Sequence, residues 1–217
     1  MPENKDYLKF YQEFVTTDEY KAVQKYFNIS KCVDYKQVGH MTYLFRNSKT
    51  KTFNEWYIYY HNSKHSDGLK WSVSRLQVVL KANKIYYSDD IVLECIKALM
   101  LYQTWIGVQQ ERELMKLLAD SNFYCLYAPT DVDLNCNVDI ILVSRKIKKW
   151  CIGIQVKPSS FFETDYTRSK TIKFFDRYHL PTVTVKYDKD TKEFIKADLK
   201  NIECMKKLLL RYEKASC

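Results

Sequence analysis

The hydrophobic positions in the first third of the chain recur mostly at helical spacing. Between Tyr7 and Phe27 apolar side chains stand three or four residues apart, and Thr16-Thr17-Asp18-Glu19 has the form of a capping box, so two short helices are predicted. Aromatic and β-branched residues are frequent in Met41–Phe45 and Trp56–Tyr60, with polar residues between them, which predicts a hairpin or two strands. Helical spacing returns over Leu69–Leu80.

Two longer helical patterns come next. Ser88-Asp89-Asp90 combines an N-cap serine with acidic residues near the positive end of the helix dipole, and it leads into an apolar pattern over Ile91–Trp105. Gly107 interrupts this pattern, and a second amphipathic helix is predicted over Val108–Ala119. The apolar side of this helix contains Glu111, which is unusual because a buried carboxylate is costly unless it is paired or binds a metal.

Beyond this helix the hydrophobic period changes to that of strands. Strands are predicted at Tyr124–Tyr127, Val138–Val143, Trp150–Val156, Thr182–Tyr187 and Glu193–Ile195, and helices at Arg168–Tyr178 and Asn201–Lys214. The order from Val108 onward is therefore α-β-β-β-α-β, followed by a short strand and a terminal helix. This order predicts a mixed α/β (α+β) fold, with one central mixed sheet flanked by helices over residues 88–217 and a helical and hairpin region over residues 1–87.

Composition excludes several classes of protein. Hydrophobic residues make up 46% of the chain, which is enough for a core, and no repeat or low-complexity segment is present. No apolar run approaches the roughly 18 residues of a membrane span, and the first residues do not have the pattern of a signal peptide. A cytoplasmic protein is therefore expected.

Seven scattered cysteines fit a reducing compartment, because their number is odd and no Cys-x-x-Cys pair occurs. We expect reduced thiols that lie mostly in the core, at Cys32, Cys95, Cys125, Cys136, Cys151, Cys204 and Cys217. His61 and His65 have a spacing that could bind zinc on a helix, but the polar residues and the glycine around them predict a loop.

The net charge of +9 comes from 35 Lys and Arg against 26 Asp and Glu. Such a charge favours a polyanionic partner without identifying it. The 18 tyrosines suit stacking and phosphate hydrogen bonds, and they suit ordinary packing equally well.

The chemistry is concentrated in two neighbouring strands that a basic turn connects. Asn137–Leu142 leads into this turn, and Cys151–Pro158 follows it. Alternation along the second strand sends Gln155 and Lys157 to one face, and Asp139 lies beside Gln155 if it begins the first strand. Oxygen ligands for a hard cation would then lie next to an ammonium group. Phosphodiester cleavage needs this set, because a cation neutralises developing charge and a lysine orients or deprotonates water.

This pattern resembles the PD-(D/E)XK nuclease superfamily over roughly Val108 to Ile195, and Gly153–Pro158 resembles the MjaI-type restriction endonucleases in particular. The resemblance implies a core of helix, three strands, helix and strand. It also implies that Asp139 is the metal-binding aspartate, that Lys157 is the catalytic lysine, and that Glu111 is the carboxylate that many members carry on the first core helix.

The sequence departs from the motif at two positions. Val138 stands where the motif has a proline, and Gln155 stands where it has Asp or Glu. A neutral amide binds a divalent cation more weakly, so Glu111 is expected to supply the missing charge. Asp131 and Asp133 compete with Asp139 for the aspartate role, but the asparagines that surround them predict a polar loop.

The resemblance implies a Mg²⁺-dependent type II restriction endonuclease that cuts both strands of a short specific duplex DNA site. A homodimer is expected, since a palindromic site presents two equivalent bonds about a two-fold axis. A cognate DNA methyltransferase is implied as a partner. A repair or structure-specific DNA nuclease with the same core, and a catalytically silent DNA-binding protein, remain as alternatives.

Residues 1–87 are expected to contribute base recognition and dimer contacts, and residues 88–217 to form the catalytic core. The candidate DNA contacts are basic side chains and two serines after Pro158 that could bind phosphate or simply stabilise a turn. They are Arg46, Lys49, Lys51, Lys70, Arg75, Ser159 and Ser160.

Overall fold

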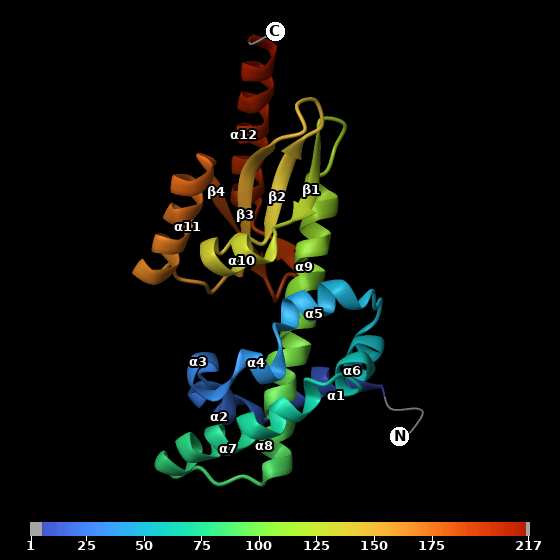
Figure 1. The fold of residues 1–217 in the computed structure, drawn as a ribbon, viewed down its shortest axis with the longest axis vertical. Coiled ribbons are helices and arrows are strands. Elements are labelled where there is room, and N and C mark those ends of the chain that lie inside the picture. Colours follow the sequence, from blue (N-terminus) through green and yellow to red (C-terminus); the bar gives the residue numbers. More distant parts are fainter. Residues whose placement is uncertain (1–5, 216–217) are drawn as a thin grey trace. The chain divides into compact units, whose positions relative to one another are not determined.

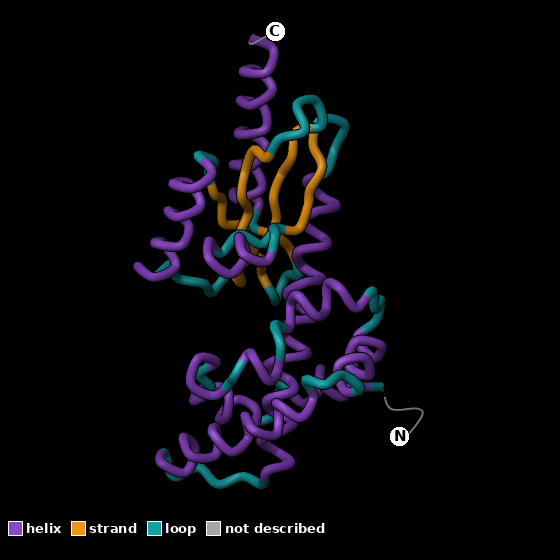
Figure 2. Tube along the Cα trace, viewed as in Figure 1, coloured by secondary structure: helices purple, strands orange, loops and turns teal. Residues whose placement is uncertain are grey.

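The computed structural model describes residues 6–215, apart from the side chains at positions 166, 167 and 212–215. The chain divides into two compact units, Met1–Val108 and Gln109–Cys217, and the boundary between them falls inside helix α9 (Gln103–Leu118). Helices make up the regular structure of residues 6–108, and all strands lie in the second unit (Figure 2). The assignment of recognition and dimerisation to residues 1–87 stays a prediction.

The described part of the first unit contains short helices and one longer helix, α7 (Figure 1). Thr17 caps α2 by accepting from the backbone N–H of Tyr20, and Ser88 caps α8 by accepting from that of Ile91. The predicted N-cap at Ser88 is therefore confirmed, whereas α2 starts at Thr17 instead of at the predicted capping box of Thr16 and Glu19. The helices are α1 (Tyr7–Phe14), α2 (Asp18–Tyr26), α3 (Ile29–Cys32), α4 (Tyr35–Val38), α5 (Met41–Ser48), α6 (Phe53–His61), α7 (Ser66–Ala82), α8 (Asp89–Lys97) and the π-helix η1 (Ala98–Tyr102).

The predicted hairpin between residues 41 and 60 is wrong, because both segments are helical. Met41 and Phe45 are buried on α5 at a spacing of four residues. Thr52 and Glu55 form a capping box that starts α6. The buried residues of α6 recur at helical spacing, and they are Phe53, Trp56, Tyr57 and Tyr60. The aromatic content of these segments suggested strands. The capping box of α6 and the helical spacing of the buried residues in both segments instead favour helices.

The predicted break at Gly107 is also wrong. Helical structure continues from α8 through η1 into α9, and a Cβ atom at Gly107 would meet nothing within 4 Å. By length and composition the stretch Asp89–Leu118 could cross a membrane, contrary to the prediction that no segment does, and 44% of its most apolar window is buried inside the protein. Buried residues such as Ile96 and Leu114 are typical of a core helix, which passes the same test.

The second unit contains a five-stranded sheet with the strand order β1-β2-β3-β4-β5. The pairs β1/β2, β2/β3 and β4/β5 are antiparallel, and β3/β4 is parallel. The predicted order of strands is confirmed, with one additional helix, α10, between β1 and β2. The elements after α9 are β1 (Phe123–Tyr127), α10 (Thr130–Cys136), β2 (Ile140–Ser144), β3 (Trp150–Pro158), α11 (Asp165–Tyr178), β4 (Thr182–Asp188), β5 (Glu193–Phe194) and α12 (Lys196–Ala215).

Helix α10 replaces the polar loop predicted around Asp131 and Asp133. Its Val132 and Cys136 are buried and stand four residues apart, so in a helix both side chains point to the same side and pack into the core. Asn137 ends the helix in the left-handed conformation, with φ of 54°. The polar residues that suggested a loop occupy the solvent side and the cap.

The sheet has a hydrophobic core on each face. Leu114 of α9 and Ile202 of α12 pack with Ile140, Ile154 and their neighbours on one face. Val132 of α10 and Phe174 of α11 pack with Ile141 and Val143 on the other face. Figure 1 shows the same arrangement, with α10 and α11 on one side of the sheet. Alternate residues of β2 and β3 therefore point into different cores.

The six described cysteines, Cys32, Cys95, Cys125, Cys136, Cys151 and Cys204, are all free thiols, and four of them are buried. Burial raises the pKa of Cys95 to about 12 and that of Cys125 to about 11, so both stay protonated near neutral pH. The prediction of reduced thiols that lie mostly in the core is confirmed for these six. Cys217 lies outside the described residues.

Gly153 allows β3 to lie close to α11, and its replacement should destabilise the protein. A Cβ atom at Gly153 would come within 2.8 Å of Cε1 of the buried Phe174 ring. We expect Gly153→Ala to lower the free energy of unfolding by about 1–3 kcal/mol through overpacking. Gly107→Ala is the matched control. Because Gly107 lies in a helix with open space around it, this substitution should raise the free energy of unfolding by about 0.5–1 kcal/mol. Urea unfolding measures both, and an unchanged Gly153→Ala variant would contradict the close approach.

Lys206 is a buried cation that connects α12 to the end of α9. Its Nζ donates to the Leu118 carbonyl oxygen at 3.1 Å and to Glu203 Oε1 at 2.8 Å, and it also pairs with Asp120. Burial would raise the pKa of Asp120, but hydrogen bonds from Lys206, Asn122 and Phe123 lower it below its usual value. The lowered pKa of Asp120 stabilises the folded protein at pH values above the pKa that Asp120 has in the unfolded chain. This stabilisation is lost as the pH falls through the pKa of Asp120 in the folded protein.

We therefore expect the wild type to lose stability steeply below about pH 4. Lys206→Met should have a free energy of unfolding about 2 kcal/mol lower at neutral pH. It should also lose less of this free energy than the wild type as the pH falls. Lys207→Met, at the exposed neighbouring position of α12, is the control. Urea midpoints between pH 7 and pH 3 measure both effects, and parallel curves for wild type and Lys206→Met would argue against this role of the ion pair.

Candidate active site

Asp139 lies immediately before β2, where two hydrogen bonds hold it against β3. Its backbone N–H donates to the Ile154 carbonyl oxygen at 2.9 Å. Its side-chain Oδ2 accepts from the backbone N–H of Val156 at 2.7 Å. At the end of the β2/β3 ladder the backbone N–H of Val156 therefore donates to this carboxylate instead of to a backbone carbonyl oxygen. This bond sets the direction of the carboxylate.

The strand register brings Asp139, Gln155 and Lys157 onto one face of the sheet. Ile141 pairs with Gly153 and Ile140 with Ile154, so the next position places Asp139 opposite Gln155. Lys157 follows two residues later on the same side of β3. Its Nζ lies 3.9 Å from Asp139 Oδ2, and the two side chains are 26% and 13% exposed. The ammonium group thus lies beside the carboxylate with access to solvent.

Gln155 is 1% exposed, and its amide is only partly hydrogen-bonded. Thr184 of the neighbouring strand β4 donates from Oγ1 to Gln155 Oε1 at 3.3 Å. The amide nitrogen Nε2 is buried and has no hydrogen-bond partner among the residues that the structure describes. Such an orphaned buried group is uncommon and indicates a position where a further ligand would be favourable.

The donor set fits a sparsely ligated hard cation. Asp139 Oδ2 is engaged by Val156 and Lys157, whereas Oδ1 takes part in no hydrogen bond or ion pair among the described residues. Mg²⁺ is commonly held by one or two carboxylates and completes its shell with water and substrate phosphate oxygens. Within residues 6–215 no cluster of three His, Cys, Asp or Glu side chains could hold a metal, so the amide of Gln155 would have to contribute.

Glu111 lies on α9 and is 7% exposed. Leu114, three residues later on the same helix, packs on the face of the sheet opposite to Gln155. The structure thus places Glu111 on the helix that covers the other core, while it brings Asp139, Gln155 and Lys157 together. The role of Glu111 as a metal ligand stays a prediction.

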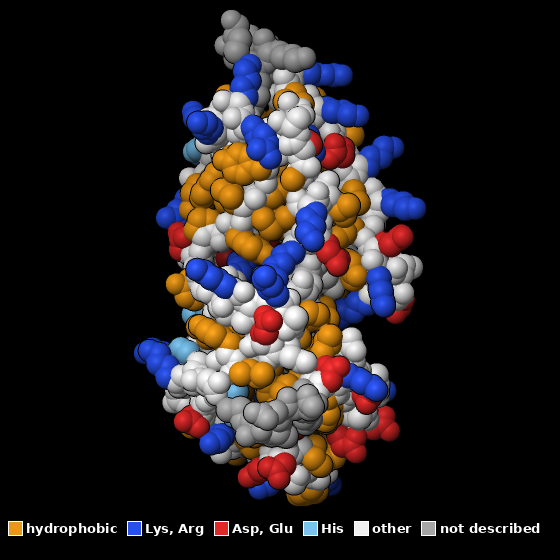
Figure 3. Space-filling view, turned by 90° about the vertical axis from the view of Figure 1, so that its right-hand side faces the viewer, with side chains coloured by type: hydrophobic (Ala, Val, Ile, Leu, Met, Phe, Trp, Pro, Cys, Tyr) orange, Lys and Arg blue, Asp and Glu red, His pale blue; other side chains and the backbone are white. Residues whose placement is uncertain are grey.

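The other candidate contacts are dispersed. Lys70 pairs with Asp67 at 3.0 Å, and the Arg75 guanidinium lies 3.5 Å from the centre of the Trp71 ring. Ser159 and Ser160 are exposed in the turn after β3. Arg46 is half-buried on α5, and Lys49 and Lys51 are exposed after its end. On the face shown in Figure 3 basic side chains are interspersed with acidic ones, so basic side chains do not form a separate stripe there.

The prediction of a loop between His61 and His65 is confirmed, because α6 ends at His61 and α7 begins at Ser66. The ring Nδ1 of His65 lies 3.0 Å from the carbonyl oxygen of Gln37.

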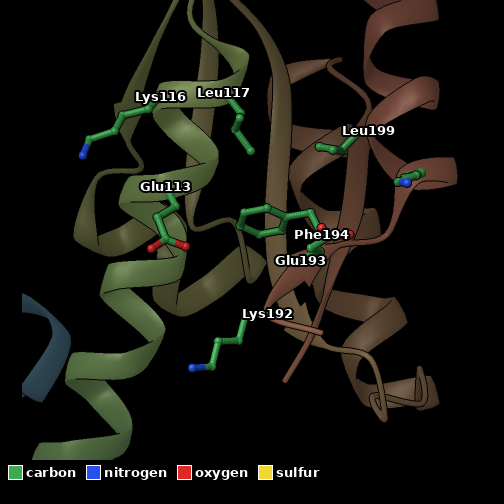
Figure 4. A pocket seen from close by; sticks show the side chains of 8 residues that line it. Glu113, Lys116, Leu117, Lys192, Glu193, Phe194 and Leu199 are labelled. Carbon is green, nitrogen blue, oxygen red and sulfur yellow. The ribbon is translucent and has the colours of Figure 1, made fainter. Parts of the chain in front are cut away.

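A pocket of about 490 Å³ lies apart from the Asp139 group, between α9 and the β5–α12 segment (Figure 4). Its apolar side chains Leu117, Phe194 and Leu199 are flanked by charges of both signs. It is lined by Glu113, Lys116, Leu117, Lys192, Glu193, Phe194, Lys196 and Leu199, and it includes none of the predicted site residues.

Thr184 is the site residue that the sequence did not single out. The alternation Thr182-Val183-Thr184-Val185 is the available signal, since it predicts a strand with one hydroxyl-bearing face. Only the pairing of Gln155 with Thr184 across β3 and β4 shows which hydroxyl meets the amide.

The mixed sheet, its flanking helices and the order of its elements form a restriction-endonuclease-like core. In a comparison with protein families, residues 22–202 match the MjaI restriction endonuclease family, and the chain belongs to this family. The resemblance stated from the sequence is thereby confirmed, and membership implies a nuclease that acts on DNA. The searches of curated proteins and of solved structures gave no match.

Replacing Asp139 should separate its structural role from its chemical one. Asp139→Asn keeps an oxygen that can accept from Val156, so we expect a change in unfolding free energy below about 1 kcal/mol. We also expect Mg²⁺ to raise the melting temperature of the wild type by binding to the folded state, and we expect this rise to be lost in Asp139→Asn. Thermal unfolding with and without Mg²⁺ measures both quantities. An Asp139→Asn protein that Mg²⁺ still stabilises fully would rule out this carboxylate as a ligand.

Proposed function

We propose that this protein is a type II restriction endonuclease that hydrolyses one phosphodiester bond in each strand of a short specific duplex DNA site, with Mg²⁺ as cofactor. The observation that supports this most is the grouping of Asp139, Gln155 and Lys157 on one sheet face, in a chain of a restriction endonuclease family. Family membership alone supports the broader class of DNA nuclease.

Asp139 and Gln155 would hold the cation. When bound, Mg²⁺ neutralises developing charge on the scissile phosphate and lowers the pKa of a bound water. Lys157 donates a hydrogen bond that orients the attacking water, because its ammonium group is partly exposed beside Asp139. The carboxylate of Asp139 in turn keeps that ammonium group in place by charge attraction.

The substrate geometry favours a homodimer. A palindromic duplex site has two equivalent scissile bonds related by a two-fold axis, and a two-fold dimer presents one catalytic centre to each. The net charge of +9 favours association with duplex DNA through its phosphates. The same proposal includes a cognate methyltransferase that protects the cell's own sites, and a cytoplasmic location that suits six free thiols.

Lys157→Ala should abolish cleavage of phage or plasmid DNA in Mg²⁺ while leaving DNA binding within a few-fold of wild type. Loss of a positioned proton-transfer or orienting group typically costs about 10²–10⁴-fold in rate. Lys149→Ala, an exposed lysine in the β2–β3 turn, is the control with the same charge change, and it should cut normally. Gel analysis of digestion and mobility-shift titration without Mg²⁺ measure the two properties.

The wild-type digest separates the proposal from its alternatives. Discrete bands from linear duplex DNA support restriction. Cutting confined to branched or damaged DNA would indicate a repair nuclease with the same core, and binding without any cutting would indicate a catalytically silent protein. Undiminished cutting by Lys157→Ala would remove this lysine from the mechanism.

A further inference from the structure

Thr184 of β4 lies directly beside Gln155 in the sheet. The parallel pairing of β3 with β4 aligns Gln155 with Thr184, while the antiparallel pairing on the other side of β3 brings Asp139 next to Gln155. Thr184 of β4, Gln155 of β3 and Asp139 just before β2 therefore form a row on one face of the sheet. The amide occupies the middle of this row, between a carboxylate and a hydroxyl group.

The orientation of the amide decides whether Gln155 can bind a cation. As it stands, Oε1 is used by Thr184 Oγ1 at 3.3 Å, and the buried Nε2 has no partner among the described residues. An amide nitrogen carries two N–H donors and no lone pair for a metal. In this orientation the unpaired N–H groups of the amide would repel a cation.

A rotation of the amide by 180° reverses this without losing the hydrogen bond. A threonine hydroxyl group can donate or accept, so after the rotation Thr184 Oγ1 accepts from Nε2. The oxygen Oε1 then occupies the position that Nε2 held and presents a lone pair there. The two orientations have nearly the same shape, so the exchange requires no change in the backbone.

We propose that Thr184 is a positioning residue for the cation site, and that its hydroxyl group holds the Gln155 amide with the oxygen directed toward the cation. This inference rests on the proposed function. It also accounts for the amide at position 155, since a carboxylate would offer an oxygen in either orientation, whereas an amide offers one only in the rotated orientation, in which Thr184 accepts from Nε2.

The test compares Thr184→Val with Thr184→Ser in the full-length protein. Thr184→Val keeps the branched shape and removes the hydroxyl group, and Thr184→Ser keeps the hydroxyl group. Mn²⁺ binding is measured by calorimetry, with Mg²⁺ competition, and urea unfolding without metal checks the fold. We expect Thr184→Val to bind Mn²⁺ about tenfold more weakly and Thr184→Ser to bind within about threefold of wild type.

The same substitution in the Gln155→Glu background separates orientation from general packing. With a carboxylate at this position no amide has to be oriented, so Thr184→Val should there weaken Mn²⁺ binding by less than about threefold. A packing defect would instead lower affinity equally in both backgrounds, and that result would overturn the inference.

Equal Mn²⁺ affinity of Thr184→Val and wild type would overturn the role of Thr184 and leave the proposed function intact. The same holds if Thr184→Ser is as weak as Thr184→Val, because the hydroxyl group would then not be the determinant. A wild type that binds no Mn²⁺, and whose DNA cleavage needs no divalent cation, would overturn the metal-dependent function and this inference together.

Discussion

The pairing of β2 with β3 is the constraint on which the candidate site depends. Asp139 comes into position because Val156 donates to its carboxylate at 2.7 Å, just where the backbone ladder of β2 ends. A shift of the pairing by one residue would send Gln155 and Lys157 into the core shared with α9 and α12, and would turn Ile154 to the other side. The hydrophobic cores on both faces therefore fix the register, and the register determines which polar side chains meet.

The two faces of the sheet differ in what they contribute to the candidate site. On one face Ile140 and Ile154 pack against α9 and α12 and supply apolar burial alone. On the other face the core formed with α10 and α11 is continuous with the polar row, and Gly153 allows Phe174 to approach β3 directly before that row begins. Close packing of Phe174 against Gly153 restricts the backbone of β3 next to Gln155, and a rotation of the Gln155 amide needs no change in this backbone.

Most of the second unit could be predicted from the sequence, because alternation and helical spacing there are local signals that burial reinforces. The spacing of Asp139, Gln155 and Lys157 implied that they share a face, and the strand register agrees. The helices at 41–48 and 53–61 were missed because aromatic residues suit either structure, and the local signal at the second helix, the capping box of Thr52 and Glu55, was not used. Thr184 could not be found, since its role depends on a neighbour 29 residues away in sequence. The side of the sheet to which α9 brings Glu111 depends equally on tertiary packing.

The glutamine in place of an acid follows from the same burial. A carboxylate at position 155 would be 1% exposed and, without a cation, would lack a compensating charge, which makes the folded protein costly to form. An amide avoids most of this cost. In the proposed enzyme the consequence is a weaker ligand set, which Mg²⁺ would complete with phosphate oxygens when DNA is present. In the proposed enzyme, cation binding and substrate binding are therefore coupled, because each supplies oxygen ligands or charge that the other lacks.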